Sequence, residues 1–359
     1  MTRFRTVFCA LLVIALFAAT GFSAALTDSL KTGKADIKSV GVMTFGPEGI
    51  LFVGDSAGGA VYAFDTQDRT ASPAASVDVT GIDQKIASML GTMPDQILIN
   101  DLAVNPISKK MYLSVSRGKG PQATPVIVRV DGKGAISQLS LDNIAFAKVE
   151  LGDAPASQGE GRQNPRTQAI TDLGWVDGKV LIAGLANEEF ASTLRAAPFP
   201  FNTAKGAGIE IWHGSHGRFE TQAPVRTFVP YKIKGEDNIL AAYTCTPLVK
   251  IPVSSLQPGA KVKGTTIAEL GSGNQPLDMI SYNKAGHPYI LLNNSNRGVM
   301  RLDAAGLENY KPITAPSDIA GVPYETVKSI TNVTQLDKVD DTMAAVLVGT
   351  TELKTIALP

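Results

Sequence analysis

The stretch LDMISYNKAGHPYILLNNSNRGVMRLD, residues 277–303, decides the fold. It contains an apolar run, a Gly/Pro/Asn turn, a second apolar run, a polar loop and an alternating run that ends at Asp303. Short apolar or alternating runs between clusters of turn residues are typical of β-strands. The stretch therefore predicts three antiparallel strands joined by two short connections.

The same arrangement recurs along the chain. A less clear unit at 238–253 keeps the second and third strands but has an indistinct first strand. In the unit that starts at residue 171, we assign the third strand to GIEIWHG, residues 208–214. A fourth strand fits between units, at 75–80, 135–141 and 264–270. The clear units occupy residues 39–65, 100–131, 171–214, 277–303 and 329–358.

A recurring four-strand unit is the signature of a β-propeller blade. We therefore predict an all-β propeller of four-stranded antiparallel blades, with six blades favoured and seven as the alternative. The last unit stops after three strands, so residues 26–38 are expected to complete the last blade. Only residues 79–93 show helical spacing, which predicts an insertion between the first two blades. A sandwich of short strands is the other alternative.

Residues 1–25 have the three regions of a signal peptide: the basic MTRFR, an apolar run and the small-residue GFSAA. We expect cleavage after Ala25, a single propeller domain over 26–359, and a periplasmic or secreted protein. A membrane anchor is the competing interpretation, but the apolar run is shorter than the roughly 20 residues that a spanning helix needs. No later segment is apolar enough to cross a membrane, and we expect a monomer.

Charge and cysteine content narrow the range of partners. Lys plus Arg and Asp plus Glu both number 33, which gives no field that would attract nucleic acid. Loss of Arg3 and Arg5 with the signal peptide leaves 31 basic against 33 acidic residues, a net charge of −2. Cys245 is then the one cysteine that remains, so no internal disulfide is expected. The expected partner is a small molecule or a periplasmic protein.

Blade geometry predicts which residues share one rim of the central channel. The first residues of innermost strands and the loops between second and third strands lie on the same rim. Asp101, Asp172 and Asp278 open first strands, and Ser39 stands at the matching place in the first unit. The loop from 186 to 208 is expected over this rim, either lining a pocket or packed on itself through its three Phe residues. The predicted binding residues of this rim are Asp55, Arg117, Arg162, Arg166, Asn187, Glu188, Arg195 and Cys245.

The pattern resembles the NHL, YVTN and SMP-30/gluconolactonase-like propellers. The stretches that carry the resemblance are FGPEGILFVGDSAGGAVYAFD, DLAVNPISKKMYLSV and DMISYNKAGHPYILLNNSNRGVMRLD, at 45–65, 101–115 and 278–303. The resemblance covers most of residues 39–358 and implies the fold. These blade features are shared by proteins of unrelated function, so the resemblance does not imply an activity.

Three carboxylates at one channel mouth repel one another unless something offsets their charge. A Ca²⁺ ion would do so, and its expected ligands are Asp172, Asn187, Asp278 and Asn293. This arrangement is similar to the calcium-dependent lactonase propellers, which have a Glu ahead of the first strand where this chain has Ser39. The structural alternative is that each Asp caps its own strand or pairs with Arg117, Arg166 or Arg195.

Two His residues and the cysteine are candidate ligands of another kind. His213 and His216 have a ligand-like spacing, but the assigned third strand would carry them to the far rim as a surface turn. A zinc site would need more ligands than these two. Cys245 could bind a soft metal, but without a His in its set it is expected to be a small buried residue.

Two functions follow. The first is an exported propeller that binds a ligand or protein at the rim lined by Asp, Asn and Arg. The second is a calcium-dependent lactonase- or esterase-like hydrolase with Asp101 or Asp172 as general base. A partner of periplasmic redox enzymes is a third idea, although the chain has no C-x-x-C-H haem motif.

Overall fold

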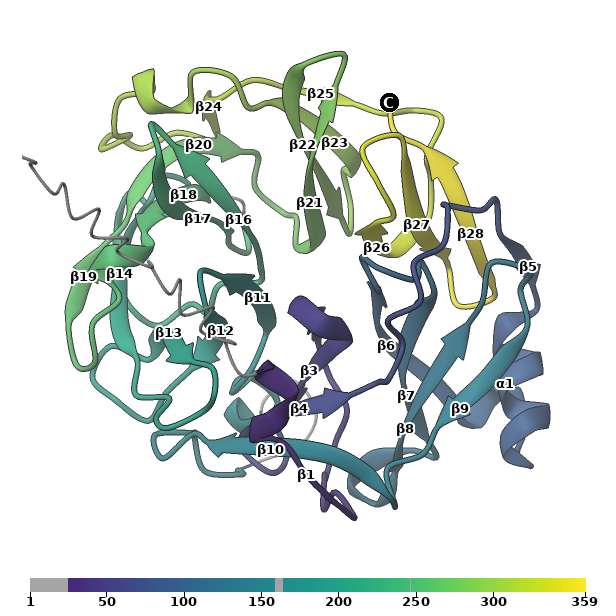
Figure 1. Ribbon diagram of the computed structural model, residues 1–359. Helices are drawn as coiled ribbons and strands as arrows, with labels where there is room; N and C mark the ends of the chain where they lie inside the picture. Colours follow the sequence, from purple (N-terminus) through teal and green to yellow (C-terminus); the bar gives the residue numbers. More distant parts are fainter. Residues whose placement is uncertain (1–24, 159–163, 246) are drawn as a thin grey trace, which may run out of the picture.

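The structure is a computed structural model that describes residues 25–158, 164–245 and 247–359. Six sheets stand around a central axis, each with its innermost strand at the channel (Figure 1). Four antiparallel strands form the body of every blade, and three blades carry additional short strands. The predicted six-bladed propeller is thereby confirmed. Residues 1–24 of the predicted signal peptide lie outside the described residues, as does Arg162.

The blades are numbered here by the order of their innermost strands along the chain. Blade 1 contains β2 (Met43–Phe45), β3 (Ile50–Asp55), β4 (Ala60–Asp65), β10 (Ile144–Glu150) and β1 (Lys31–Gly33). Blade 2 contains β6 (Ile97–Val104), β7 (Met111–Arg117), β8 (Thr124–Val130) and β9 (Ile136–Leu139). Blade 3 contains β11 (Asp172–Val176), β12 (Lys179–Leu185), β13 (Ser192–Pro198), β14 (Ala207–His213), β15 (Arg218–Glu220) and β19 (Lys261–Lys263).

The remaining three blades follow one another in the chain. Blade 4 contains β16 (Thr227–Ile233), β17 (Glu236–Ala242), β18 (Pro247–Pro252), β20 (Thr265–Leu270) and β24 (Ile319–Gly321). Blade 5 contains β21 (Pro276–Lys284), β22 (His287–Asn294), β23 (Gly298–Asp303) and β25 (Tyr324–Thr326). Blade 6 contains β26 (Val333–Lys338), β27 (Met343–Val348), β28 (Glu352–Ala357) and β5 (Asp78–Thr80).

The blades do not follow one another around the ring in chain order. The innermost strand of blade 1, β2, contacts β6 of blade 2 on one side and β11 of blade 3 on the other. On its far side β6 contacts β26 of blade 6. The order around the axis is therefore 1, 3, 4, 5, 6, 2, so the purple blade 1 lies between the blue and teal blades in Figure 1.

This order explains how the ring closes. Strand β5 (78–80) precedes blade 2 in the chain but pairs with β28 as the fourth strand of blade 6. The prediction that residues 26–38 complete the last blade is wrong, because β1 pairs instead with β10 at the outer edge of blade 1. Of the predicted strand at 75–80, residues 78–80 form β5, but in the last blade. The fourth strand of blade 1 is β10, which follows blade 2.

Hydrophobic clusters fill the spaces between neighbouring blades. Leu51 and Val53 of β3 pack toward blade 2, whereas Ile50 and Phe52 pack toward blade 3. Alternate residues of one strand thus face different neighbours, and both faces are buried. This is why the central strands read as continuous apolar runs. The other clusters join blades 3 and 4, 4 and 5, 5 and 6, and 6 and 2.

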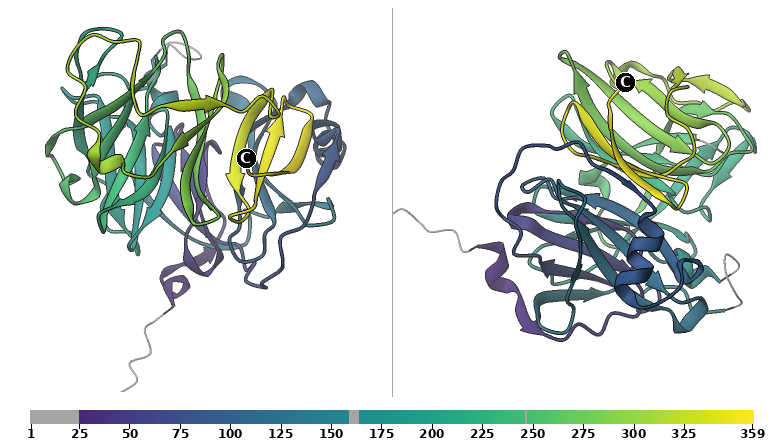
Figure 2. Two further views of the ribbon diagram at one scale, coloured as in Figure 1. Left: turned by 90° about the horizontal axis from the view of Figure 1, so that it is seen from above. Right: turned by 90° about the vertical axis from the view of Figure 1, so that its right-hand side faces the viewer.

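The predicted helix is α1 (Ile82–Leu90), which lies at the periphery beside blade 2 (Figure 2). Its buried residues Ile82 and Ile86 join the cluster between blades 2 and 6. Gly81 and Gly91 bound the helix with φ of 67° and 63°, a backbone region that favours glycine. Within the described residues, no helix combines the length and apolar character that a membrane crossing requires.

The strand assignment in blade 3 corrects one sequence prediction. The segment 186–208 is not one long loop, because it contains β13, whose residues pair with β12 along its whole length. GIEIWHG, residues 208–214, therefore belongs to the fourth strand, β14, rather than the third. Since successive antiparallel strands run in opposite directions, the end of β14 at His213 lies at the rim opposite to the one predicted.

Candidate functional site

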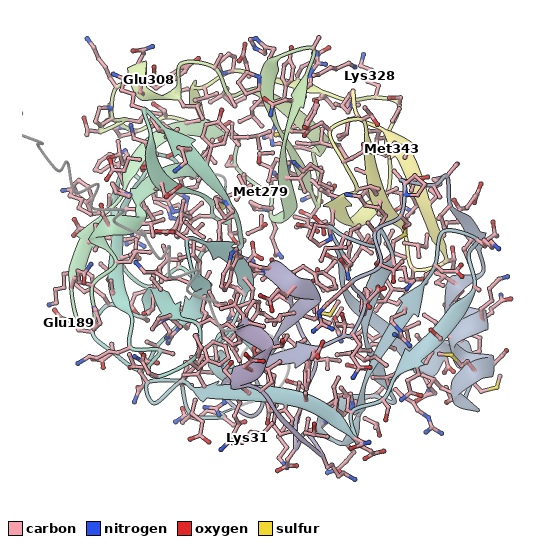
Figure 3. All side chains as sticks on the ribbon, viewed as in Figure 1. Lys31, Glu189, Met279, Glu308, Lys328 and Met343 are labelled. Carbon is pink, nitrogen blue, oxygen red and sulfur yellow. The ribbon has the colours of Figure 1, made fainter. Side chains whose placement is uncertain are left out.

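The predicted convergence of acids is present at the centre of the ring. Residues from all six innermost strands line a channel cavity of about 290 Å³. Asp101, Asp172 and Asp278 are in its wall, and so is Asp337 of β26, which sequence reasoning missed. The signal that could have found Asp337 is its place on the first strand of the last unit. Figure 3 shows Met279, the neighbour of Asp278, at the inner end of blade 5.

The channel carboxylates hold neighbouring blades together. Asp278 accepts hydrogen bonds from the N–H of Met279 at 2.8 Å and of Leu336 in blade 6 at 2.9 Å. Asp337 in turn accepts one from the N–H of Val104 in blade 2 at 2.7 Å. Asp172 and Asp101 make the equivalent contacts across the junctions from blade 3 to blade 4 and from blade 2 to blade 1.

These contacts match the structural alternative, in which each Asp accepts hydrogen bonds at the start of a strand. The acids accept from backbone N–H groups of their own and the neighbouring strand, and none of these hydrogen bonds in the described chain involves Arg117, Arg166 or Arg195. A carboxylate that accepts such bonds is positioned and partly neutralised by peptide dipoles.

Burial sets the protonation of the channel acids. It raises the pKa of Asp172 to about 7 and the pKa of Asp337 to about 6, against the hydrogen bonds that lower them. Burial also raises the pKa values of Asp101 and Asp278 well above the ordinary value, and repulsion between neighbouring channel carboxylates adds to the shift. Burial in the cavity therefore favours the neutral form of these carboxyl groups more than exposure to water would.

The four residues predicted to bind calcium do not line one cavity. Asp172 and Asp278 face the channel. Asn293 is buried beside Asp278, and its Nδ2 donates to the carbonyl of Val333 at 2.8 Å. Asn187 is exposed outside the channel, with its backbone N–H donating to the carbonyl of Asp153. Because Asn187 lies in the exposed loop beyond the end of β12, the predicted set is separated.

The predicted binding residues divide in a similar way. The carboxylate of Asp55 stabilises a turn, where it accepts hydrogen bonds from the backbone N–H groups of Lys38, Ser39 and Gly58. Arg166 donates to the carbonyls of Ala57 and Pro155 and ties a turn of blade 1 to the chain before blade 3. Neither Asp55 nor Arg166 is among the residues that line the channel cavity or the larger cleft described next. Arg117 ends β7 with an exposed side chain.

A cleft of about 910 Å³ lies between blade 1 and blade 3. Its wall is formed by the end of β10, the loop from Glu188 to Phe190, the segment from Phe201 to Gly206, and the chain before β19. Glu189 lies on the outer side of the ring in Figure 3, so this cleft is peripheral rather than central. Of the predicted binding residues, Glu188 lines it.

A buried ion pair supports one wall of this cleft. Arg195 lies on β13, not in a loop as predicted, and its side chain is 0% exposed. Its Nη2 donates to Oδ1 of Asp153, a cleft residue, at 2.6 Å. Nε and Nη1 of Arg195 have no hydrogen-bond partner among the described residues. Arg195 thus positions Asp153, which in turn holds the backbone of Asn187.

Cys245 and the two His residues come together, contrary to the prediction. The fourth strand β14 carries His213 to the rim where the turn between β17 and β18 holds Cys245. One ring nitrogen of His213, one of His216 and Sγ of Cys245 lie within 4.8 Å of one another. The predicted surface turn is present at 214–217, where His216 is exposed, but its predicted place at the far rim is wrong because the strand before it was misassigned.

Comparisons with known proteins identify no family for this chain. No protein-family model and no curated protein matches the sequence. Among solved structures, a putative glucose dehydrogenase from Thermus thermophilus has a TM-score of 0.33 and 12% identity, covering 91% of this chain and 100% of that one. A putative 6-phosphogluconolactonase from Bacteroides uniformis has a TM-score of 0.32 and 12% identity, covering 89% of this chain and 78% of that one.

A streptogramin B lyase has a TM-score of 0.31 and 11% identity, covering 92% of this chain and 97% of that one. This likeness, with TM-scores of 0.31–0.33, is weak and adds nothing to the fold that the six sheets define. It carries no information about activity at these identities.

Proposed function

We propose that this chain is an exported β-propeller that binds a small polar ligand in the cleft between blades 1 and 3. The observation that carries the proposal is the cleft's volume of about 910 Å³, against about 290 Å³ for the channel cavity. Ligand sites for small molecules usually have volumes of about 300–1,000 Å³. Of the segments expected at the binding rim, residues of 186–208 line this cleft.

The lining residues indicate the ligand's chemistry. Lys261 is 2.6 Å from Glu189 and 4.7 Å from the ring centre of Phe190, so its charge is already paired. Glu188 and Lys205 form no ion pair within the described part of the chain. A ligand with both positive and negative groups, and an apolar part that contacts Phe190 or Phe201, matches this lining.

Thermal unfolding of the mature chain with a panel of amino acids, dipeptides and sugar acids tests the proposal. A ligand should raise the melting temperature by mass action. Glu188→Gln and Lys205→Gln should each weaken its binding at least tenfold in calorimetry. Lys34→Gln, on the exposed Lys34–Asp142 pair, is the matched control and should bind normally. Unchanged binding in both cleft variants would place the ligand elsewhere.

Export rests on the N-terminal sequence pattern. Expression of residues 1–359 with its own leader should deliver a periplasmic or secreted protein that begins at Leu26. Mass spectrometry of the purified chain measures the cleavage point. Retention of Arg3 and Arg5 in a membrane fraction would instead support an anchor.

The alternative is a calcium-dependent hydrolase that acts at the channel. The convergence of four carboxylates favours it, while the backbone N–H groups bound to them and the outward position of Asn187 argue against it. Elemental analysis and melting with and without a calcium chelator decide between the two. Bound calcium together with turnover of a lactone or ester panel would support the hydrolase.

A further inference from the structure

A second group of chemically active side chains lies where blade 3 meets blade 4, away from both cavities. His213 ends β14, His216 lies in the turn before β15, and Cys245 lies in the turn between β17 and β18. Their ligand atoms are within 4.8 Å of one another. Atoms that bind one tetrahedral ion at ordinary lengths are about 3.3–3.8 Å apart. A small side-chain movement would bring all three to one ion.

One carboxylate orients both rings. Oε2 of Glu220 lies 2.7 Å from Nδ1 of His213, and Oε1 lies 2.8 Å from Nδ1 of His216. Because a carboxylate accepts, the hydrogen of each ring sits on Nδ1, which leaves a lone pair on each Nε2. A carboxylate behind a ligating His is the usual support in metal sites, where it sets the tautomer and the ring direction.

The buried ring supplies an independent observation. His213 is 2% exposed, and its Nε2 has no hydrogen-bond partner among the described residues. A buried polar atom without a partner costs free energy, and native structures rarely leave one in this state. The ring of His216, whose centre is 3.9 Å from the ring centre of His213, cannot supply a donor because its own Nε2 carries a lone pair, and Sγ of Cys245 belongs to the same group.

The position of Cys245 is set by the backbone of its turn. Its N–H donates to the carbonyl of Asn274 in the chain before blade 5 at 2.9 Å, and its φ is 61°. A non-glycine residue in this left-handed region needs support from its surroundings. The turn thereby holds the sulfur against the end of β14.

We propose that His213, His216 and Cys245 bind a borderline-soft transition-metal ion, with Zn²⁺ as the first choice. Imidazole nitrogen and thiolate sulfur select zinc, copper or cobalt over Ca²⁺ and Mg²⁺, which prefer oxygen. On binding, the thiol of Cys245 loses its proton to solvent and the sulfur forms the metal bond. His216 is partly exposed, with 43% of its side chain accessible, so the fourth position faces solvent or a partner.

This site is separate from the ligand cleft, and the inference does not depend on the proposed function. The metal would connect the β14–β15 turn of blade 3 to the β17–β18 turn of blade 4. It would also satisfy the buried Nε2 of His213. The chain has three His residues, so the third, His287, provides a matched control.

Titration of the chelator-treated mature protein with Co²⁺, followed by displacement with Zn²⁺, tests the site. One equivalent of Co²⁺ should produce a thiolate-to-metal charge-transfer band together with the strong visible bands of tetrahedral cobalt. Cys245→Ser should abolish the charge-transfer band. His216→Gln, at an exposed position, should weaken Zn²⁺ binding at least tenfold while the circular dichroism spectrum stays unchanged. Glu220→Gln should weaken binding by about 10–100-fold.

His287→Gln should bind as tightly as the unaltered chain, because His287 contacts Asp303 on blade 5 at 2.8 Å, away from the cluster. The proposal is overturned if no charge-transfer band forms, or if folded Cys245→Ser and His216→Gln variants bind Zn²⁺ within twofold of the unaltered chain. Loss of stoichiometric Zn²⁺ binding in His287→Gln, with binding kept in the other variants, would also overturn the proposal.

Discussion

The carboxylate of Asp172 accepts a hydrogen bond from the backbone N–H of Phe228 at 2.6 Å, across the junction between blades 3 and 4. Comparable bonds join blade 5 to 6, blade 6 to 2, and blade 2 to 1. All four run in the same direction around the ring. The channel acids therefore stabilise the junctions between neighbouring blades through these hydrogen bonds.

Loss of one such hydrogen bond between blades should destabilise the propeller. We expect Asp172→Ala to lower the free energy of unfolding by about 1–3 kcal/mol at pH 5, because the N–H of Phe228 loses its acceptor. Urea unfolding measures the change. Asp142→Ala, at an exposed ion pair, should change stability by less than about 0.5 kcal/mol. Equal effects of the two substitutions would contradict the role of Asp172 in stabilising the junction between blades.

The channel acids also predict how stability changes with pH. Asp carboxyls titrate near pH 4 in an unfolded chain, whereas burial raises the pKa of Asp172 to about 7 and of Asp337 to about 6. Between about pH 4 and 7 the folded state therefore holds more protons, and stability falls as the pH rises. The unfolding free energy should be higher at pH 5 than at pH 8 from these groups.

Burial lowers the pKa of His213, so this group makes stability rise with pH below about pH 6.5 and opposes the contribution of the channel acids. A variant of one channel acid separates the two contributions. In Asp172→Asn the amide cannot titrate, so the fall in stability between pH 5 and pH 8 should be smaller than in the unaltered chain. Denaturant unfolding across the range gives both slopes. A variant with the same slope would show that Asp172 does not titrate there.

The order of the blades can be tested by cross-linking. Asp78 of β5 and Lys354 of β28 are directly opposite in the antiparallel pairing that closes blade 6. Opposite residues in such pairs have Cα atoms about 4.5–5.5 Å apart, within the range of a disulfide. Asp78→Cys with Lys354→Cys, in a Cys245→Ser background, should form an internal disulfide.

The matched pair Thr32→Cys with Lys354→Cys tests the closure that the sequence predicted, in which residues 26–38 complete the last blade. It should remain reduced, because Thr32 pairs with Ala145 of blade 1. Peptide mass mapping without reductant distinguishes the two outcomes. A disulfide in the Thr32 pair alone would restore the simpler ring order.

The buried pair beside the cleft should respond unequally to loss of its partners. Asp153→Asn leaves the fully buried guanidinium of Arg195 without a counter-ion, and we expect a loss of about 3–5 kcal/mol. Arg195→Met leaves a carboxylate that is 18% exposed, so its cost should be smaller. Urea unfolding of both variants and of the double variant measures the coupling. Glu150→Gln, at an exposed pair with Lys148, is the control.

The local sequence pattern was enough to predict the strands of the blades and three of the four carboxylates in the channel. Each three-strand unit repeats within a short stretch, so the strands of 277–303 and the turn-forming Asp131 and Asp303 follow from residues close in the chain. Asp101, Asp172 and Asp278 occupy equivalent positions in the repeat. In a ring of blades, equivalent positions on the innermost strands face the same channel.

The amino-acid sequence by itself determined the propeller of four-stranded blades, with six blades favoured over seven, because alternating and apolar runs set strands and turns locally. Only the tertiary structure decided the order of the blades, the closing strand β5 and the meeting of His213 with Cys245. These depend on pairings between segments far apart in the chain, and identical strand patterns are compatible with several such pairings. The choice among them is made by side-chain packing between whole blades, which no single segment contains.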